Sequence, residues 1–166
     1  MAEYLFRYRG WILGAVALAF VVAADPSGAS LWAGAAVSLV GLLLRLWAIS
    51  WIGPAARTRD TRAPSVRVTG GPYRLRHPLY VANVLVAAGF AWACRPSLTQ
   101  LTVGVAAVTA FYLVLAGREE KALAVGRVPD GVRPRLTLRK TLRTERSTWA
   151  GGIAGYALLV ALLLVG

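Results

Sequence analysis

Five apolar runs dominate the chain and constrain its fold more than any other feature. They span residues 10–24, 31–52, 79–94, 98–116 and 149–165. A helix needs about 20 residues to cross a bilayer, with roughly 17 to 25 as the usual range. The second, fourth and fifth runs are therefore long enough, and basic side chains beside the shorter first and third runs can extend to the interface. The pattern predicts an all-α, polytopic membrane protein with about five transmembrane helices.

Composition excludes several other classes of protein. The chain is 57% hydrophobic and 16% charged, with a mean hydropathy of +0.58, which is too apolar for a soluble fold of 166 residues. A single cysteine, Cys94, and a single histidine, His77, argue against a disulfide and against a metal site. The net charge of +12 lies between apolar runs rather than in a separate soluble region, which favours an anionic membrane surface over nucleic acid as the partner.

The distribution of basic residues predicts the orientation in the membrane. Lysine and arginine concentrate before the first apolar run, in residues 53–78 and in residues 117–148. The connection between the first two runs, residues 25–30, has none, and the connection between the third and fourth runs has only Arg95. Because basic loops face the cytoplasm, we expect a cytoplasmic N-terminus and active face, in a plasma or inner membrane. An alternative is that residues 1–24 form a cleaved signal peptide.

The organisation follows from these spans. We expect one membrane domain over residues 1–166, with a basic cytoplasmic connection at 124–148 and a C-terminal transmembrane helix at 149–166. The two long connections hold most of the polar side chains, so function is expected there. The oligomeric state stays open.

One polar stretch precedes the third run. Gly70 and Gly71 permit unusual backbone angles and Pro72 then fixes the chain, so a shaped loop is predicted. Pro78 suits the first position of a helix, whose free N–H groups, with Arg76 and His77, would attract an anion. Tyr80 and Asn83 then share a helix face with His77. The alternative is that Arg76, His77 and Tyr80 only anchor the helix among the lipid headgroups.

A second polar feature follows the fourth run, where Glu119 and Glu120 are the only adjacent acidic residues. Carboxylates at a helix C-terminus are unfavourable unless nearby arginines or a ligand compensate them. Runs three and four form a hairpin, so His77 and Glu119 are expected to meet at its cytoplasmic rim. Such a pocket suits a small zwitterionic molecule that carries hydroxyls.

The segments GGPYRLRHPLYVAN and REEKAL, at this separation, resemble the signature of the isoprenylcysteine carboxyl methyltransferase and phospholipid methyltransferase superfamily, over residues 66–123. The resemblance implies an S-adenosylmethionine pocket. Relatives follow the glutamates with an aromatic segment, which residues 121–148 lack. Arg76 is added to the residues implied by the resemblance, because it lies beside the helix start that would attract an anion. The expected cofactor-binding residues are then Tyr73, Arg76, His77, Tyr80, Asn83, Glu119 and Glu120.

The resulting hypothesis is methyl transfer from S-adenosylmethionine to a lipid-embedded or lipid-attached acceptor, preferably the carboxylate of a prenylated or isoprenoid-like substrate. Alternatives are a phospholipid amine as the acceptor, and a non-catalytic scaffold that binds anionic headgroups. No catalytic side chain is assigned. Arg74, Arg76 and Arg45 are candidates for orienting the acceptor. Arg45 lies inside the second run, where a charge is either functional or reaches to the interface.

Overall fold

The computed structural model describes residues 2–52, 67–68, 70–125, 130–131 and 135–165. Five helices run through it: α1 (Ala2–Val22), α2 (Gly28–Ile52), α3 (Pro78–Ala93), α4 (Leu98–Val125) and α5 (Leu138–Val165). A short 3-10 helix, η2 (Gly71–Leu75), precedes α3. Two-residue strands β1 (Arg67–Val68) and β2 (Asp130–Gly131) pair in parallel. The predicted all-α fold is confirmed.

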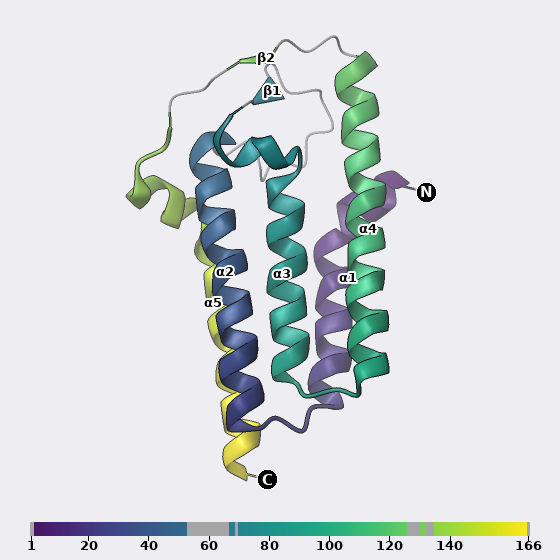
Figure 1. The fold of residues 1–166 in the computed structure, drawn as a ribbon, viewed down its shortest axis with the longest axis vertical. Helices are drawn as coiled ribbons and strands as arrows, with labels where there is room; N and C mark the ends of the chain where they lie inside the picture. Colours follow the sequence, from purple (N-terminus) through teal and green to yellow (C-terminus); the bar gives the residue numbers. More distant parts are fainter. Residues whose placement is uncertain (1, 53–66, 69, 126–129, 132–134, 166) are drawn as a thin grey trace.

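The helices also match the expected spans. Three of them are long and apolar enough to cross a membrane: α2, α5 and the Leu98–Lys121 part of α4. The apolar part of α1, Gly10–Val22, and α3 are shorter, as the sequence predicted. The N-terminus lies toward the end of the bundle that carries β1, β2 and η2, and the C-terminus lies at the opposite end (Figure 1). An odd number of spans requires this arrangement.

Three helices extend beyond the apolar runs from which they were predicted. The stretch predicted as a basic connection at 124–148 becomes helical from Leu138, so α5 begins eleven residues before the expected residue 149. The helices α1 and α4 likewise extend beyond the apolar runs, to Ala2 and Val125. Apolarity marks the part of a helix that lies in lipid, but backbone hydrogen bonding continues through polar turns. In α5 these additional polar turns bury Thr141 and Glu145.

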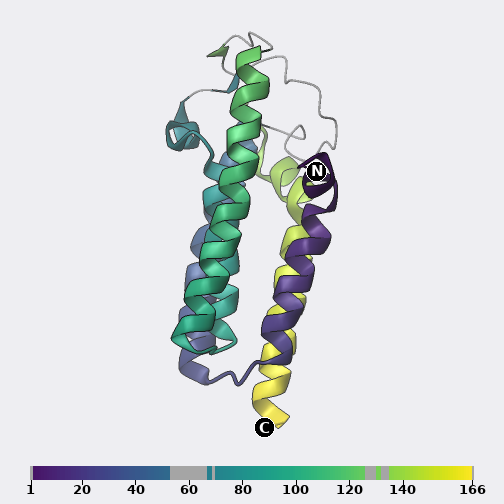
Figure 2. The ribbon, with the colours of Figure 1, turned by 90° about the vertical axis from the view of Figure 1, so that its right-hand side faces the viewer.

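The five helices form two layers. Helices α2, α3 and α4 stand side by side in one layer, and α1 and α5 lie behind them (Figures 1 and 2). The helix α5 packs mainly on α2, and α1 packs on α3 and α4. Phe20 of α1 and Leu159 of α5 also meet in one apolar cluster with Leu31 and Ala93. The two helices of the second layer are thus supported mainly by the first layer.

Small residues allow α2 and α3 to approach closely, and this is the most extensive helix contact in the described chain. A Cβ atom added to Gly41 would lie 2.8 Å from the carbonyl oxygen of Ala82. One added to Gly89 would lie 2.5 Å from the backbone nitrogen of Ser38. The Ser38 hydroxyl donates to the Val86 carbonyl across the same contact, at 3.2 Å. Close backbone approach through small residues is the usual way in which helices associate in lipid, where water cannot drive association.

The close contact makes a prediction about stability. We expect Gly89→Ala to lower the free energy of unfolding by about 1–3 kcal/mol, because the added methyl overpacks the α2–α3 contact. Gly117→Ala on α4 is the matched control, since its added Cβ meets no atom within 4 Å. That substitution should be neutral or slightly stabilising. Thermal unfolding in detergent measures both, and equal effects would contradict a limiting contact at Gly89.

Candidate functional site

The loop before α3 has a fixed shape. Gly70 and Gly71 adopt φ angles of 88° and 51°, in the region that favours glycine. The Trp51 ring from α2 covers this turn, and a Cβ atom on Gly71 would lie 2.5 Å from its Cε2. The guanidinium of Arg135 stacks over the Trp51 ring, 4.2 Å from its centre. The predicted shaped loop is confirmed, and Trp51 connects it to the segment that leads into α5.

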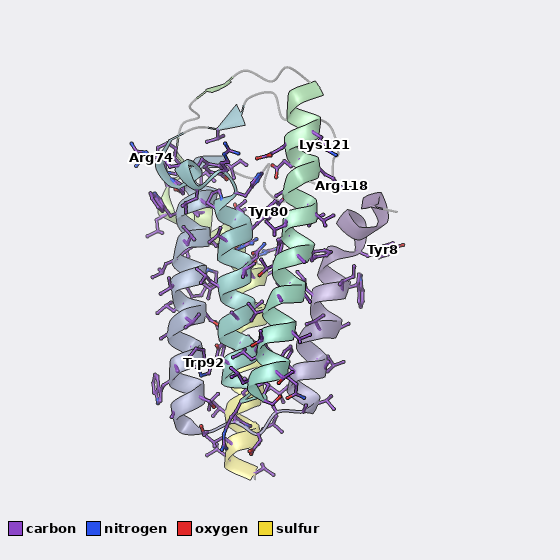
Figure 3. The ribbon with its side chains drawn as sticks, turned by 45° about the vertical axis from the view of Figure 1, so that its right-hand side comes forward. Tyr8, Arg74, Tyr80, Trp92, Arg118 and Lys121 are labelled. Atoms are coloured by element: carbon purple, nitrogen blue, oxygen red, sulfur yellow. The ribbon has the colours of Figure 1, made fainter. Side chains whose placement is uncertain are left out.

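The start of α3 directs two side chains toward α4. His77 is the N-cap residue and Pro78 the first residue of the helix, as predicted. Tyr80 lies one turn further on, and Figure 3 shows it on the side of α3 that faces α4. Its ring stacks on the His77 imidazole, with ring centres 5.4 Å apart. The two aromatic rings therefore form one wall beside α4.

The paired glutamates of α4 lie opposite these rings. Nε2 of His77 is 3.2 Å from Oε1 of Glu120, and Nδ1 is 3.6 Å from Oε2 of Glu119. The Tyr80 hydroxyl donates to Oε2 of Glu119 at 2.9 Å. One guanidinium nitrogen of Arg76 lies 3.9 Å from Glu120. The predicted meeting of His77 and Glu119 is confirmed.

The electrostatics of the glutamates differ from the expectation. Because α4 continues to Val125, Glu119 and Glu120 do not lie at its C-terminus, and the unfavourable interaction with the helix dipole is reduced. The imidazole, the Tyr80 hydroxyl and Arg76 partly compensate their charge. Both carboxylate side chains stay about two-fifths exposed, at 42% and 41%. They remain accessible to a ligand.

Tyr73 supplies a polar atom without a partner. Its hydroxyl is buried and makes no hydrogen bond among the described residues. Burial, and secondly the negative charge of Glu119, raise the pKa of this hydroxyl well above its ordinary value. The phenol therefore keeps its proton at neutral pH and can donate a hydrogen bond. A buried donor of this kind is costly unless a ligand satisfies it.

A second polar cluster lies deeper in the bundle. Arg45 of α2 donates through Nε and a terminal nitrogen to the carboxylate of Glu145 on α5. The other terminal nitrogen of Arg45 donates to the side-chain oxygen of Asn83 on α3. Three helices are joined by these contacts. Arg45 therefore does not extend to the interface but is paired inside the bundle.

An apolar cavity of about 720 Å³ lies between the two layers. All five helices contribute to its wall, including Leu13 from α1, Leu42 from α2 and Tyr156 from α5. Asn83 and Tyr112 are among its few polar lining residues. Tyr112 stacks on Tyr80, with ring centres 5.3 Å apart. The cavity thus borders both polar clusters.

The predicted residues divide into two groups. Those beside α4 come together: Arg76, His77, Tyr80, Glu119 and Glu120. Tyr73 makes no hydrogen bond to these described residues, but the charge of Glu119 helps to raise the pKa of its hydroxyl. Asn83 instead joins Arg45, and Arg74 is exposed on the side of η2 away from α4 (Figure 3). Residues 53–66 and 69 lie outside the described chain.

Sequence reasoning missed Glu145, Tyr112 and Trp51. Glu145 had a signal, because Arg45 inside a span needs a carboxylate partner and the chain has only seven acidic residues. Tyr112 and Trp51 had none, since aromatic residues at helical spacing are common on any apolar face.

Comparison with protein families places the chain in a known family. The family described as phospholipid methyltransferase matches residues 29–125, which include α2, α3, α4 and both polar clusters except Glu145. No curated protein and no solved structure matches the chain significantly.

The unsatisfied hydroxyl makes a prediction about stability. We expect Tyr73→Phe to raise the free energy of unfolding of the ligand-free protein by about 1 kcal/mol at pH 7, because it removes a buried donor without a partner. Tyr80→Phe removes the bond to Glu119 and should lower it by about 0.5–1.5 kcal/mol. Above about pH 10 the advantage of Tyr73→Phe should grow, since Tyr73 ionises there only when unfolded. Denaturant unfolding in detergent at several pH values tests both.

Proposed function

This chain belongs to the phospholipid methyltransferase family, and from that premise we propose that it transfers a methyl group from S-adenosylmethionine to a lipid acceptor at the cytoplasmic end of its helix bundle. The family supports methyl transfer in a membrane. The observation that carries the proposal is the His77, Tyr80, Glu119 and Glu120 cluster, in which a histidine and two carboxylates meet across α3 and α4.

The residues of this cluster fit S-adenosylmethionine. Glu119 and Glu120 are accessible carboxylates that can bind an ammonium group or ribose hydroxyls, and the buried Tyr73 hydroxyl can donate to a cofactor oxygen. Arg76 and the start of α3 can bind the cofactor carboxylate. When bound, S-adenosylmethionine supplies a methyl group whose bond to sulfur breaks as the acceptor forms its bond to carbon, with the electron pair left on sulfur. The protein contributes mainly by positioning the two reactants.

The cavity supports a lipid acceptor with one chain. A water molecule in the liquid takes ~30 Å³, and a methylene group is of similar size. A volume of about 720 Å³ therefore holds roughly two dozen heavy atoms. That is enough for one prenyl chain with a small head. A carboxylate head also needs no general base, because it is already ionised, whereas an ammonium group must first lose a proton. We therefore favour a prenylated or isoprenoid-like carboxylate.

A phospholipid amine is the second candidate, because the matching family is described by phospholipid methylation.

Cofactor binding is the first test. We expect isothermal titration in detergent to detect S-adenosylmethionine binding to the wild type, and Glu119→Ala and His77→Ala to weaken it by about tenfold or more through the loss of charge-assisted contacts. Arg118→Ala is the matched control, since Arg118 is exposed on the same helix. Unchanged binding in both site variants would refute the site, and no binding to the wild type would favour a headgroup-binding scaffold.

Acceptor identity is the second test. Purified protein with methyl-tritiated S-adenosylmethionine is offered S-farnesylcysteine or dioleoylphosphatidylethanolamine. We expect label in S-farnesylcysteine that mild alkali releases as methanol, because a methyl ester is hydrolysed and a methylamine is not. Alkali-stable label in the phospholipid would identify the amine as the acceptor instead.

A further inference from the structure

The ion pair between Arg45 and Glu145 is costly and needs an explanation. Charged groups within membrane helices are expensive and mark functional sites by default. A buried pair often contributes no more stability than apolar residues of similar size. The helix α5, which carries Glu145, also lies outside the family match at residues 29–125. The pair is thus a feature that the family signature does not cover.

In the cluster of Arg45, Asn83 and Glu145, the hydrogen-bond donors are more exposed than the Glu145 carboxylate that accepts from Arg45. The Glu145 side chain is 1% exposed, whereas that of Arg45 is 15% exposed. The Asn83 side-chain oxygen accepts from Arg45, so its amide N–H groups remain for another partner, and Asn83 lines the cavity. The accessible chemistry at this end of the cavity is therefore suited to an anionic oxygen.

The residues next to Arg45 and Glu145 show that these hydrogen-bond donors lie beside the apolar cavity. Leu42, one turn from Arg45, and Thr148, one turn from Glu145, both line the cavity with Asn83. Tyr112 of α4, also in the cavity wall, stacks on Tyr80, whose hydroxyl donates to Glu119. A lipid tail in the cavity would therefore bring its head to Asn83, close to the proposed cofactor site.

We propose that Asn83 donates to a carboxylate oxygen of the acceptor, and that Glu145 is a positioning residue which holds Asn83 in this orientation through Arg45. This inference rests on the proposed function and names its acceptor subsite. Arg45 is fixed by two bonds to one carboxylate, which leaves its third bond to set the side-chain amide of Asn83. The amide then presents its N–H groups to the cavity. Recognition of the acceptor head thus depends on a residue of α5.

The experiment measures binding of S-farnesylcysteine against its methyl ester, which lacks the negative charge. Tritiated S-farnesylcysteine is bound to the full-length protein in detergent and displaced by each compound. We expect the wild type to prefer the acid by about tenfold or more, as for a hydrogen bond to a charged group. Asn83→Asp keeps the shape and the oxygen that accepts from Arg45 but has no N–H to donate, so it should lose this preference.

A paired variant separates positioning from folding. Glu145→Gln alone leaves Arg45 without its counter-charge and risks instability. The double variant Arg45→Leu, Glu145→Leu removes both charges, so it should keep a thermal midpoint near that of the wild type while losing the preference for the acid. S-adenosylmethionine binding should stay unchanged in both Asn83→Asp and the double variant. Ser38→Ala, about two turns deeper in the same cavity, is the control and should keep the preference.

The outcomes are distinct. Equal binding of acid and ester by the wild type would overturn the subsite, and so would a double variant that retains the preference. If Ser38→Ala also lost the preference for the acid over the ester, the cavity as a whole would recognise the acceptor, and the specific role of Asn83 would be refuted. If the wild type prefers the acid but does not bind S-adenosylmethionine, the subsite stands and the proposed methyl transfer fails.

Discussion

The close approach of α2 and α3 determines where the polar groups of this protein lie. The glycines at this contact leave no room for a side chain, so the two backbones pack almost directly on each other. At that separation Arg45 can reach across to Asn83 on the neighbouring helix. The same contact supports α5, because the Ser38 hydroxyl also lies 2.8 Å from that of Tyr156. Larger residues there would separate the groups that form the deeper cluster.

The meeting of the histidine and the paired glutamates could be predicted from sequence because it depends on topology. Two spans joined by a turn at residues 94–97 are antiparallel neighbours, so the start of one lies beside the end of the other. His77 and Glu119 are brought together whatever the details of side-chain packing. The glycine loop was predictable for a similar reason, since its constraint is in the backbone.

The deeper cluster could not be predicted in this way. Glu145 lies in a polar turn of α5 that apolarity alone does not separate from a loop, and this hid the partner of Arg45. The cavity was equally hidden, because its walls are apolar faces of five helices whose relative rotation depends on packing between the layers. Asn83 was expected beside His77, yet it bonds to Arg45 of α2.

The two-layer arrangement places the polar cluster and part of the cavity wall on different helices, so mutations can change them separately. The described members of the cluster around Glu119 and Glu120 come from η2, from the start of α3 and from α4, whereas α1 and α5 line the cavity and α5 supplies the partner of Arg45. Leu13 of α1 packs against the buried α4 cluster of Val108, Tyr112 and Leu115, whereas Ile153 of α5 lines the cavity and is 66% exposed, so Ile153 can be exchanged without disturbing the first layer. Substitutions at such exposed lining positions of α5 can therefore adapt the cavity to a lipid of different length. The cluster around Glu119 and Glu120 stays unchanged.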